Sequence, residues 1–317
     1  MASLMRYLIE IIDLLDDPRV DGWAVKRFFE EKGFKDLLIN VEKIRGGKGS
    51  TDFISITIPG SKGRLSGGDA PTLGVIGRLG GLGARPGLIG LVSDADGAIV
   101  SLAVAYKIAD MRRRGDILPG DVIVNTHICP NAPTKPHKPA PMMDSPVDIF
   151  DLLKREVDNV MDAVLSIDAT KANWIVKHTG FAITPTVKEG WILKVSPDLI
   201  DIYMRVTGEP PVIVPITMQD ILPFSTPVYH INSILQPWLY TKAPVVGVAT
   251  TTRIVVPGSA TGATNIFSLE QAARFVVEVA KDFTMGRARF YDEDEWKIIM
   301  KIHGEISHIM RRGVPER

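Results

Sequence analysis

The fold is decided by residues 93–130, which read SDADGAIVSLAVAYKIADMRRRGDILPGDVIVNTHICP. A helix is predicted over Ala98–Arg114, because the run rich in Ala, Val and Ile continues for several turns until Gly115 stops it. A short apolar run, Asp121–Thr126, then predicts a buried strand, and polar residues follow it. A helix that leads into a buried strand is the repeating unit of an α/β sheet.

Strand and helix patterns continue on both sides of this stretch. Further strands are expected at Ile39–Ile44, Phe53–Ile58, Thr72–Ile76, Leu88–Val92, Ala163–Ile167, Val212–Pro215 and Val245–Thr251, and further helices at Leu4–Leu15, Gly22–Lys32, Ile149–Asp158, Pro197–Thr207, Ser268–Phe283 and Asp292–Arg312. The alternation predicts a three-layer α/β fold with a mixed, mostly parallel central sheet and helices on both faces. We expect one such domain over residues 1–290, followed by a C-terminal helix and tail over residues 291–317.

The composition is that of an ordinary globular protein, and the balance of charges argues against some classes of binding partner. Lys plus Arg and Asp plus Glu both number 37, so the formal net charge is zero and no nucleic-acid partner is expected. The one cysteine, Cys129, excludes an intrachain disulfide and favours a reducing compartment. The start of the chain does not read as a signal peptide, and the longest apolar run is far short of the ~20 residues that span a bilayer. We therefore expect a cytoplasmic protein, and the scarcity of glutamine and cysteine suggests a thermophilic source.

Eight glycines within residues 74–97 raise the question of a nucleotide-binding loop. The dinucleotide pattern G-x-G-x-x-G fails, because Pro86 stands at its third glycine position. The P-loop pattern fails at Lys48, which is followed by Gly49 rather than by Ser or Thr. We therefore expect tight turns in this region and no nucleotide cofactor.

Two acidic residues precede the helix that begins near Ala98. Asp94 and Asp96 follow an apolar run that ends at Val92. Ligands of open α/β sheets gather at the carboxyl ends of strands, so both carboxylates are candidate site residues. The simpler alternative is that one of them caps the helix, whose dipole favours a negative charge there.

Two other predicted strands end in side chains with ligand chemistry. Strand alternation places His127 and Cys129 on the same side, which suits a soft metal or an activated thiolate; the alternative is a buried free cysteine beside a hydrogen-bonded histidine. Asp168 ends another strand, either as a turn residue or as a site residue. The candidate polar site comprises Asp94, Asp96, His127, Cys129 and Asp168, and one divalent metal would be held by Asp94, His127 and Asp168.

The order of these segments resembles the two-zinc exopeptidase superfamily of aminopeptidases and carboxypeptidases. Those proteins open with two helices and a pair of strands that ends in Pro-Gly, as Gly49–Gly60 does here. Asp94–Ala98 looks like the segment that carries the metal-bridging aspartate, and Asp168 looks like a later ligand. The His-x-Asp ligand pair of the superfamily, however, is replaced here by Arg78 and Gly80.

Further departures concern the other ligands and the base. Residues around Cys129 stand where the superfamily has a Glu-Glu pair, and Thr261 or a neighbour stands near its late histidine. A two-zinc site uses about five side-chain ligands and a carboxylate that activates water. Standard two-zinc peptidase activity is therefore not expected.

The chain also resembles an uncharacterised family of bacterial and archaeal proteins of unknown function. The runs that carry this likeness are Gly74–Gly81, Gly90–Gly97, Thr126–Pro133, Tyr229–Pro237 and Pro244–Ala249. Two functions remain open. The first is a catalytically silent relative of the exopeptidases that acts through binding or homo-oligomeric assembly. The second is a metal-dependent hydrolase whose site has moved to the strand ends.

Self-association is suggested by the last predicted helix. Its apolar stripe consists of Trp296, Ile299, Met300, His303, Ile306 and Met310. Residues three or four apart share a helix face, so the stripe either docks on the core of its own chain or contacts another copy. We expect a homo-oligomer, in extended form if contacts repeat, with a terminal segment in a subunit contact.

Overall fold

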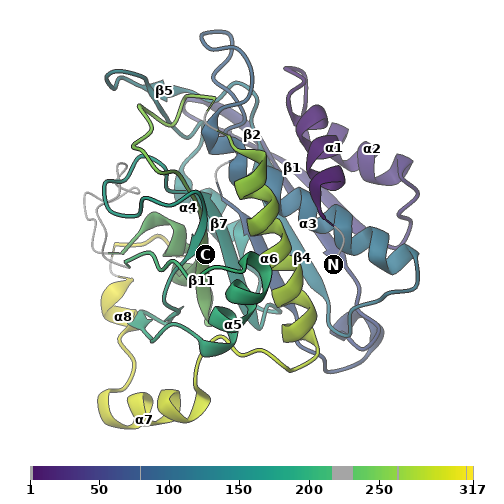
Figure 1. Cartoon of the computed structure of the whole chain (residues 1–317), viewed down its shortest axis with the longest axis vertical. Helices are drawn as coiled ribbons and strands as arrows, with labels where there is room; N and C mark the ends of the chain where they lie inside the picture. Colours follow the sequence, from purple (N-terminus) through teal and green to yellow (C-terminus); the bar gives the residue numbers. More distant parts are fainter. Residues whose placement is uncertain (1–2, 79, 216–230, 263, 312, 317) are drawn as a thin grey trace.

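A nine-stranded sheet runs through the described part of the chain (Figure 1). The computed structural model describes residues 3–78, 80–215, 231–262, 264–311 and 313–316. The strands follow the order β1-β2-β4-β3-β7-β11-β9-β10, and β8 also pairs with β11. Their bounds are β1 Leu38–Gly46, β2 Gly49–Ile58, β3 Leu73–Gly77, β4 Val122–Ile128, β7 Ala163–Ala169, β8 Gly180–Ile183, β9 Val187–Lys188, β10 Trp191–Ile192 and β11 Val245–Thr251.

The centre of the sheet is parallel and its margins are antiparallel. β3 pairs in parallel with both β4 and β7, and β7 pairs in parallel with β11. β1 and β2 form an antiparallel hairpin at one side, while β8, β9 and β10 are antiparallel at the other. The carboxyl ends of β3, β4, β7 and β11 therefore share one edge, which we call the carboxyl edge. The mixed, mostly parallel α/β sheet predicted from the sequence is confirmed.

Helices cover both faces of this sheet. One face carries α1 (Met5–Leu15), α2 (Gly22–Glu31), α3 (Asp96–Arg113), α5 (Pro197–Thr207) and α6 (Ile266–Thr284). The other carries α4 (Ile149–Glu156) and the 3-10 helix η3 (Ser233–Tyr240). α1 turns only one stripe inward, whereas α3 is buried on most sides because it lies between the sheet, α1 and α6.

Short elements complete the chain. They are the 3-10 helices η1 (Arg64–Ser66) and η2 (Ser93–Ala95), the small ribbon of β5 (Thr134–Lys135) with β6 (Met142–Met143), and the C-terminal helices α7 (Glu293–His303) and α8 (Ser307–Met310). Helix α7 projects at the lower left of Figure 1, beyond the layers around the sheet. None of the helices within the described ranges is both long and apolar enough to span a bilayer.

The start of α3 lies directly against the sheet, and glycine permits the contact. A Cβ atom on Gly97 would come within 2.0 Å of the carbonyl oxygen of Arg78 and 2.8 Å of that of Ile167. A Cβ atom on Gly77 would meet the Ser101 hydroxyl of α3 at 2.2 Å. Gly77 thus faces α3, and because side chains alternate along a strand, Arg78 faces the opposite layer of α4 and η3.

Two strands predicted near the site are wrong. Leu88–Val92 forms turns and coil, and the ladder beside β4 is instead continued by backbone bonds of Gly80 and Leu82 to Cys129, each 2.9 Å long. Val212–Pro215 contributes one isolated bridge, between Ile213 and Ile183, rather than a strand.

Two helix boundaries also differ. α6 begins at Ile266, because the side chain of Asn265 accepts hydrogen bonds from the N–H groups of Phe267 and Ser268. The single helix predicted over Asp292–Arg312 is wrong, since Gly304 has a φ of 71° and ends α7. The stripe predicted along it is therefore divided between α7 and α8. Leu79, Tyr229, His230, Arg312 and the side chain of Met310 lie outside the described residues.

Candidate functional site

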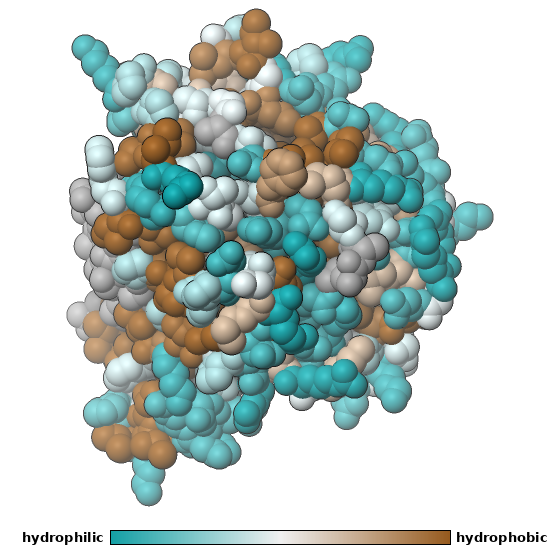
Figure 2. Space-filling view, viewed as in Figure 1, coloured by the Kyte–Doolittle hydropathy of each residue, from teal (hydrophilic) through white to brown (hydrophobic). Residues whose placement is uncertain are grey.

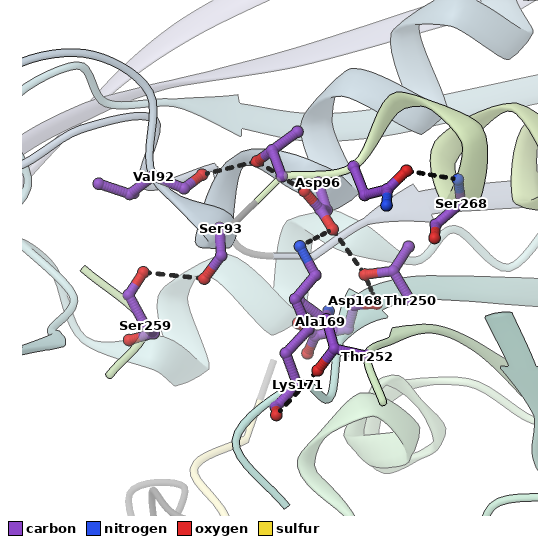
Figure 3. Close-up of polar contacts among 12 residues, drawn as sticks. Val92, Ser93, Asp96, Asp168, Ala169, Lys171, Thr250, Thr252, Ser259 and Ser268 are labelled. Atoms are coloured by element: carbon purple, nitrogen blue, oxygen red, sulfur yellow. Dashed lines mark hydrogen bonds and ion pairs between the residues drawn. The ribbon is translucent and has the colours of Figure 1, made fainter. Parts of the chain in front are cut away.

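The carboxyl edge gathers segments that are far apart in the sequence (Figure 3). The loop after β7 supplies Lys171, the end of β11 supplies Thr250, and the first turn of α3 supplies Asp96. Helix α6 also begins at this edge, which brings Thr264 next to α3. The edge is therefore lined by polar side chains from at least four segments.

Asp96 lies at the centre of a buried, fully paired cluster. Its side chain has no exposed surface. Its Oδ2 lies 2.5 Å from the Lys171 ammonium and accepts a 2.6 Å hydrogen bond from the Thr250 hydroxyl, while its Oδ1 accepts one of 3.0 Å from Thr264. Both oxygens are thus engaged. The capping alternative does not apply to Asp96, because Ala95 stands at the N-cap of α3 and no side chain caps it.

Asp94 and Asp168 are also buried. Asp94 belongs to η2, and its Oδ2 lies 3.6 Å from the position that a Cβ on Gly81 would occupy. Asp168 lies near the end of β7, and its Oδ1 accepts a 2.6 Å hydrogen bond from the N–H of Ala169. The Thr250 hydroxyl links this strand to Asp96, since it also lies 3.5 Å from the carbonyl oxygen of Asp168.

His127 faces the opposite layer and is held in one tautomer. Its Nε2 accepts a 2.9 Å hydrogen bond from the N–H of Gly80, so the neutral ring carries its proton on Nδ1. Burial, with a smaller contribution from the charge of Arg78, lowers the pKa of His127 to about 3. The imidazole is therefore neutral at physiological pH. Its Nδ1 has no hydrogen-bond partner among the described residues.

A buried ion pair lies in the same row of the sheet. Gly77 pairs with Thr126 and with Ile167, so the next residues along each strand, Arg78, His127 and Asp168, emerge together on the α4 side. The Arg78 guanidinium lies 3.2 Å from Glu156 at the end of α4, and both side chains are buried. Burial raises the pKa of Glu156, and the Arg78 charge opposes that shift.

Several buried polar atoms on this face have no partner in the part of the chain that the structure describes. They are His127 Nδ1, Asn125 Oδ1, Ser166 Oγ and Thr251 Oγ1. Strand alternation places all four on the α4 side of β4, β7 and β11. Buried polar groups are normally hydrogen-bonded, so a buried water is the expected partner at each of these positions, which lie on three different strands.

Cys129 is a buried thiol rather than an activated nucleophile. Its sulfur lies 3.6 Å from the carbonyl oxygen of Ser50 and is almost fully buried. Burial raises its pKa to about 11, and the nearby Asp52 carboxylate acts in the same direction. Burial therefore opposes formation of the thiolate and favours the alternative of a buried free cysteine. Cys129 and His127 follow each other along the strand, but the structure gives no contact between their side chains.

The described side chains do not fit a metal site. No group of three or more His, Cys, Asp or Glu residues among them is arranged to hold an ion. Asp96 is engaged by an ammonium, and the row of His127 and Asp168 contains the Arg78 guanidinium. A metal cation at Asp96 would meet the fixed positive charge of Lys171.

Sequence reasoning missed the residues that hold the site together. Lys171, Thr250, Thr264 and Glu156 were not expected to act there. One signal was available, because an arginine inside the apolar run around β3 must be buried, and a buried arginine requires a carboxylate partner. Nothing comparable pointed to Lys171, which stands in an irregular loop.

The fold is that of an α/β protein with a mixed, mostly parallel sheet and helices on both faces. A solved structure of similar fold is the glutaminyl cyclase of an Acidobacteriales bacterium, with a TM-score of 0.51 and 11% sequence identity over 90% of this chain and 94% of that one. A search of curated proteins finds no match. The chain belongs to the family described as "Protein of unknown function (DUF1177)", which matches residues 42–313. The expected membership of a family of unknown function is confirmed.

Proposed function

We propose that this chain is a catalytically silent relative of the aminopeptidase-like enzymes, and that it binds a small polar ligand at the carboxyl edge without a catalytic metal. The observation that carries the proposal is the contact of 2.5 Å between the Lys171 ammonium and the Asp96 carboxylate, both fully or almost fully buried. In the resemblance to two-zinc exopeptidases, Asp94–Ala98 looks like the segment of the metal-bridging aspartate, and Asp94 is the residue that corresponds to that ligand. Asp96 lies in the same segment, and its carboxylate is paired with a side-chain cation.

The second cation supports the same conclusion. Arg78 stands where the exopeptidases have a metal-binding histidine, and it is paired with Glu156 at 3.2 Å. Two-zinc hydrolysis needs a metal-bound water and a carboxylate base. Two fixed side-chain cations and a protonated Cys129 thiol supply neither.

The unpartnered polar atoms on the α4 side support a binding role. His127 Nδ1 is a donor, Asn125 Oδ1 is an acceptor, and Ser166 Oγ can be either. A ligand with both hydrogen-bond donors and acceptors would satisfy these groups at little cost, because the protein has already removed them from water.

The test compares metal binding by the wild type and by Lys171→Met, with Lys177→Met as the matched control. Untagged protein purified without chelator should contain well below one metal ion per chain. Zinc should not raise the melting temperature of the wild type, since only a ligand of the native state stabilises it. Zinc should leave the melting temperature of Lys177→Met unchanged as well, and a rise confined to Lys171→Met would show that the Lys171 ammonium occupies a position that can hold a cation.

The metal-dependent hydrolase is the competing function. The buried carboxylates of Asp94 and Asp168 favour it, because they are oxygen ligands at the carboxyl edge. One tightly held zinc ion per wild-type chain, together with hydrolysis of aminoacyl amides, would overturn our proposal. Binding itself is tested by melting temperatures with small acids, amides and alcohols. A compound that stabilises the wild type but not Ser166→Ala identifies the ligand class, and no stabilisation by any compound argues against a binding role.

A further inference from the structure

Two loops at the carboxyl edge and the start of α6 expose large apolar side chains. The loop after β7 carries Trp174, which is 83% exposed, and Ile175, which is 60% exposed. Ile254 in the loop after β11 is 74% exposed, and Phe267 in the first turn of α6 is 71% exposed. Side chains exposed to this extent project into water and do not line a groove of their own chain. We call these four residues the apolar loop surface.

Contacts between these segments bring the four side chains into one region. The carbonyl oxygen of Lys171 in the loop after β7 accepts a 3.3 Å hydrogen bond from the Thr252 hydroxyl in the loop after β11. A Cβ atom on Gly180, where the first of these loops ends, would lie 2.7 Å from the side-chain oxygen of Gln271. Gln271 is four residues after Phe267 and therefore lies on the same face of α6. Figure 2 shows hydrophobic residues on the left side of the molecule, where these loops run in Figure 1.

A third loop, which follows β4, lies beside the loop after β11. The N–H of Ala260 donates a 3.1 Å hydrogen bond to the carbonyl oxygen of Pro141. The segments that meet here, residues 129–143, 170–180 and 252–267, contain no Asp or Glu. These loops can therefore approach a negatively charged partner without repulsion from their own side chains.

The same segments carry cations. Their Lys and Arg residues are Lys135, Lys138, Lys171, Lys177 and Arg253. Lys135 is paired with Asp144. Lys171 is paired with Asp96, and the Lys177 ammonium is buried, so none of these three is available to a partner. Lys138 and Arg253 are exposed and form no ion pair with another residue that the structure describes. The charge that the region presents to a partner is therefore positive.

We infer that the apolar loop surface docks on a lipid bilayer that contains anionic lipids. The apolar side chains would enter the headgroup boundary, where tryptophan is enriched, and Lys138 and Arg253 would face the anionic headgroups. The four apolar side chains come from separate segments and project outward, so they fit a soft apolar phase better than the fixed pockets of a protein partner. The attachment is at the bilayer surface, since no helix within the described ranges can span a bilayer. The inference does not depend on the proposed ligand or on the absence of a metal.

Docking of this kind should be reversible and depend on salt. Each lysine or arginine near an anionic surface strengthens binding roughly fivefold. The apolar side chains add to this by leaving water, in the way that one weak lipid anchor and a basic patch together give stable attachment. Binding should therefore need both the apolar loop surface and the two cations, and it should weaken as salt screens the charges.

The first experiment measures sedimentation of the full chain with vesicles of phosphatidylcholine that contain about 30% phosphatidylserine, and with vesicles of phosphatidylcholine alone. The wild type should bind the anionic vesicles about tenfold more tightly or better. Trp174→Ser/Ile254→Ser should weaken that binding about tenfold or more, because two apolar side chains no longer leave water. The matched control is Ile298→Ser/Ile302→Ser, which changes two isoleucines, 56% and 65% exposed, on α7, a helix that projects away from these loops in Figure 1. It should bind as the wild type does.

The second experiment tests the cations. Lys138→Ala/Arg253→Ala should weaken binding to the anionic vesicles about 25-fold and leave binding to the neutral ones unchanged. The control, Arg287→Ala/Lys301→Ala, removes two exposed cations outside these loops. It should change binding less than about threefold, because charges farther from the lipid than a Debye length of about 10 Å are largely screened. Unchanged melting temperatures show that each variant is folded.

Three results would overturn the inference. The first is a wild type that does not bind the anionic vesicles, and the second is a Trp174→Ser/Ile254→Ser variant that binds them as tightly as the wild type. The third is self-association of the wild type in light scattering that this variant loses, without any vesicle binding, which would assign the surface to a contact between copies. Equal binding by Lys138→Ala/Arg253→Ala and the wild type would overturn the role of anionic lipid.

Discussion

The carboxyl edge buries charged side chains, whereas helix α7 exposes apolar ones. At the edge, charged groups such as Asp96 and Lys171 are buried and paired. On α7, apolar groups such as Ile298 and Ile302 remain in water. A buried charge is costly unless its partner is present, whereas an exposed isoleucine costs the monomer little. Mutations at the edge should therefore change folding stability far more than mutations of the exposed isoleucines of α7 do.

The largest loss of folding stability is expected when the Asp96–Lys171 pair is broken. Lys171→Met leaves a carboxylate buried without its cation, and removal of one partner of a buried pair typically costs about 3–5 kcal/mol. The free energy of unfolding, measured with urea, should fall by that amount. The double variant Asp96→Asn/Lys171→Met removes both charges and should recover part of the loss. A double variant less stable than Lys171→Met would show that the charge pair does not dominate this cluster.

A smaller loss of folding stability is expected when His127 is protonated at low pH. The pKa of this imidazole is about 3 in the folded protein and about 6.5 in an unfolded chain, so the unfolded state binds more protons between these values. The contribution to stability is complete above about pH 6.5 and is lost as the pH falls towards 3. Between about pH 7.5 and pH 5, the loss should be about 2 kcal/mol.

The control for this pH dependence is His127→Gln. Glutamine can still accept the hydrogen bond from Gly80 but does not titrate. Between about pH 7.5 and pH 5, the free energy of unfolding in urea should fall further for the wild type than for His127→Gln. The other titrating groups are the same in the two proteins, so the difference reports on His127. Parallel pH profiles for the two proteins would contradict the assignment of the depressed pKa to His127.

The smallest effect is expected on α7. Ile298→Ala and Ile302→Ala should each change the unfolding free energy of the monomer by less than about 0.5 kcal/mol, since exposed positions contribute little. The measurement is the free energy of unfolding in urea. A loss above about 1 kcal/mol would mean that these side chains pack on their own chain, and the contrast with the carboxyl edge would disappear.

The sheet could be predicted from the sequence because its signals are local. The apolar runs of β4, β7 and β11 and the long helix after Asp96 each have a period that identifies them. The wrong predictions also have local causes. The apolar spacing in Leu88–Val92 resembles a strand, yet the glycines around it allow turns, and Gly304 interrupts an otherwise continuous helical pattern.

The site was only partly predictable because its partners are distant in sequence. Asp94, Asp96, His127 and Asp168 were identified from their places next to strands. The pairing of Asp96 with Lys171, and of Arg78 with Glu156, depends on how the chain folds back on itself, and no spacing encodes it. The orientation of α7 was also hidden, since its helical period alone does not tell which face meets the body.

The contact at Gly97 has a consequence for how this site can change over evolutionary time. The helix that carries Asp96 rests on the backbone carbonyl oxygens of two strands, at a position where even one extra carbon would collide. The contact joins a glycine to main-chain carbonyl oxygens, so no side chain takes part in it. It therefore does not depend on which polar residues line the edge. The polar residues that line the edge can therefore be substituted while the helix keeps its place on the sheet.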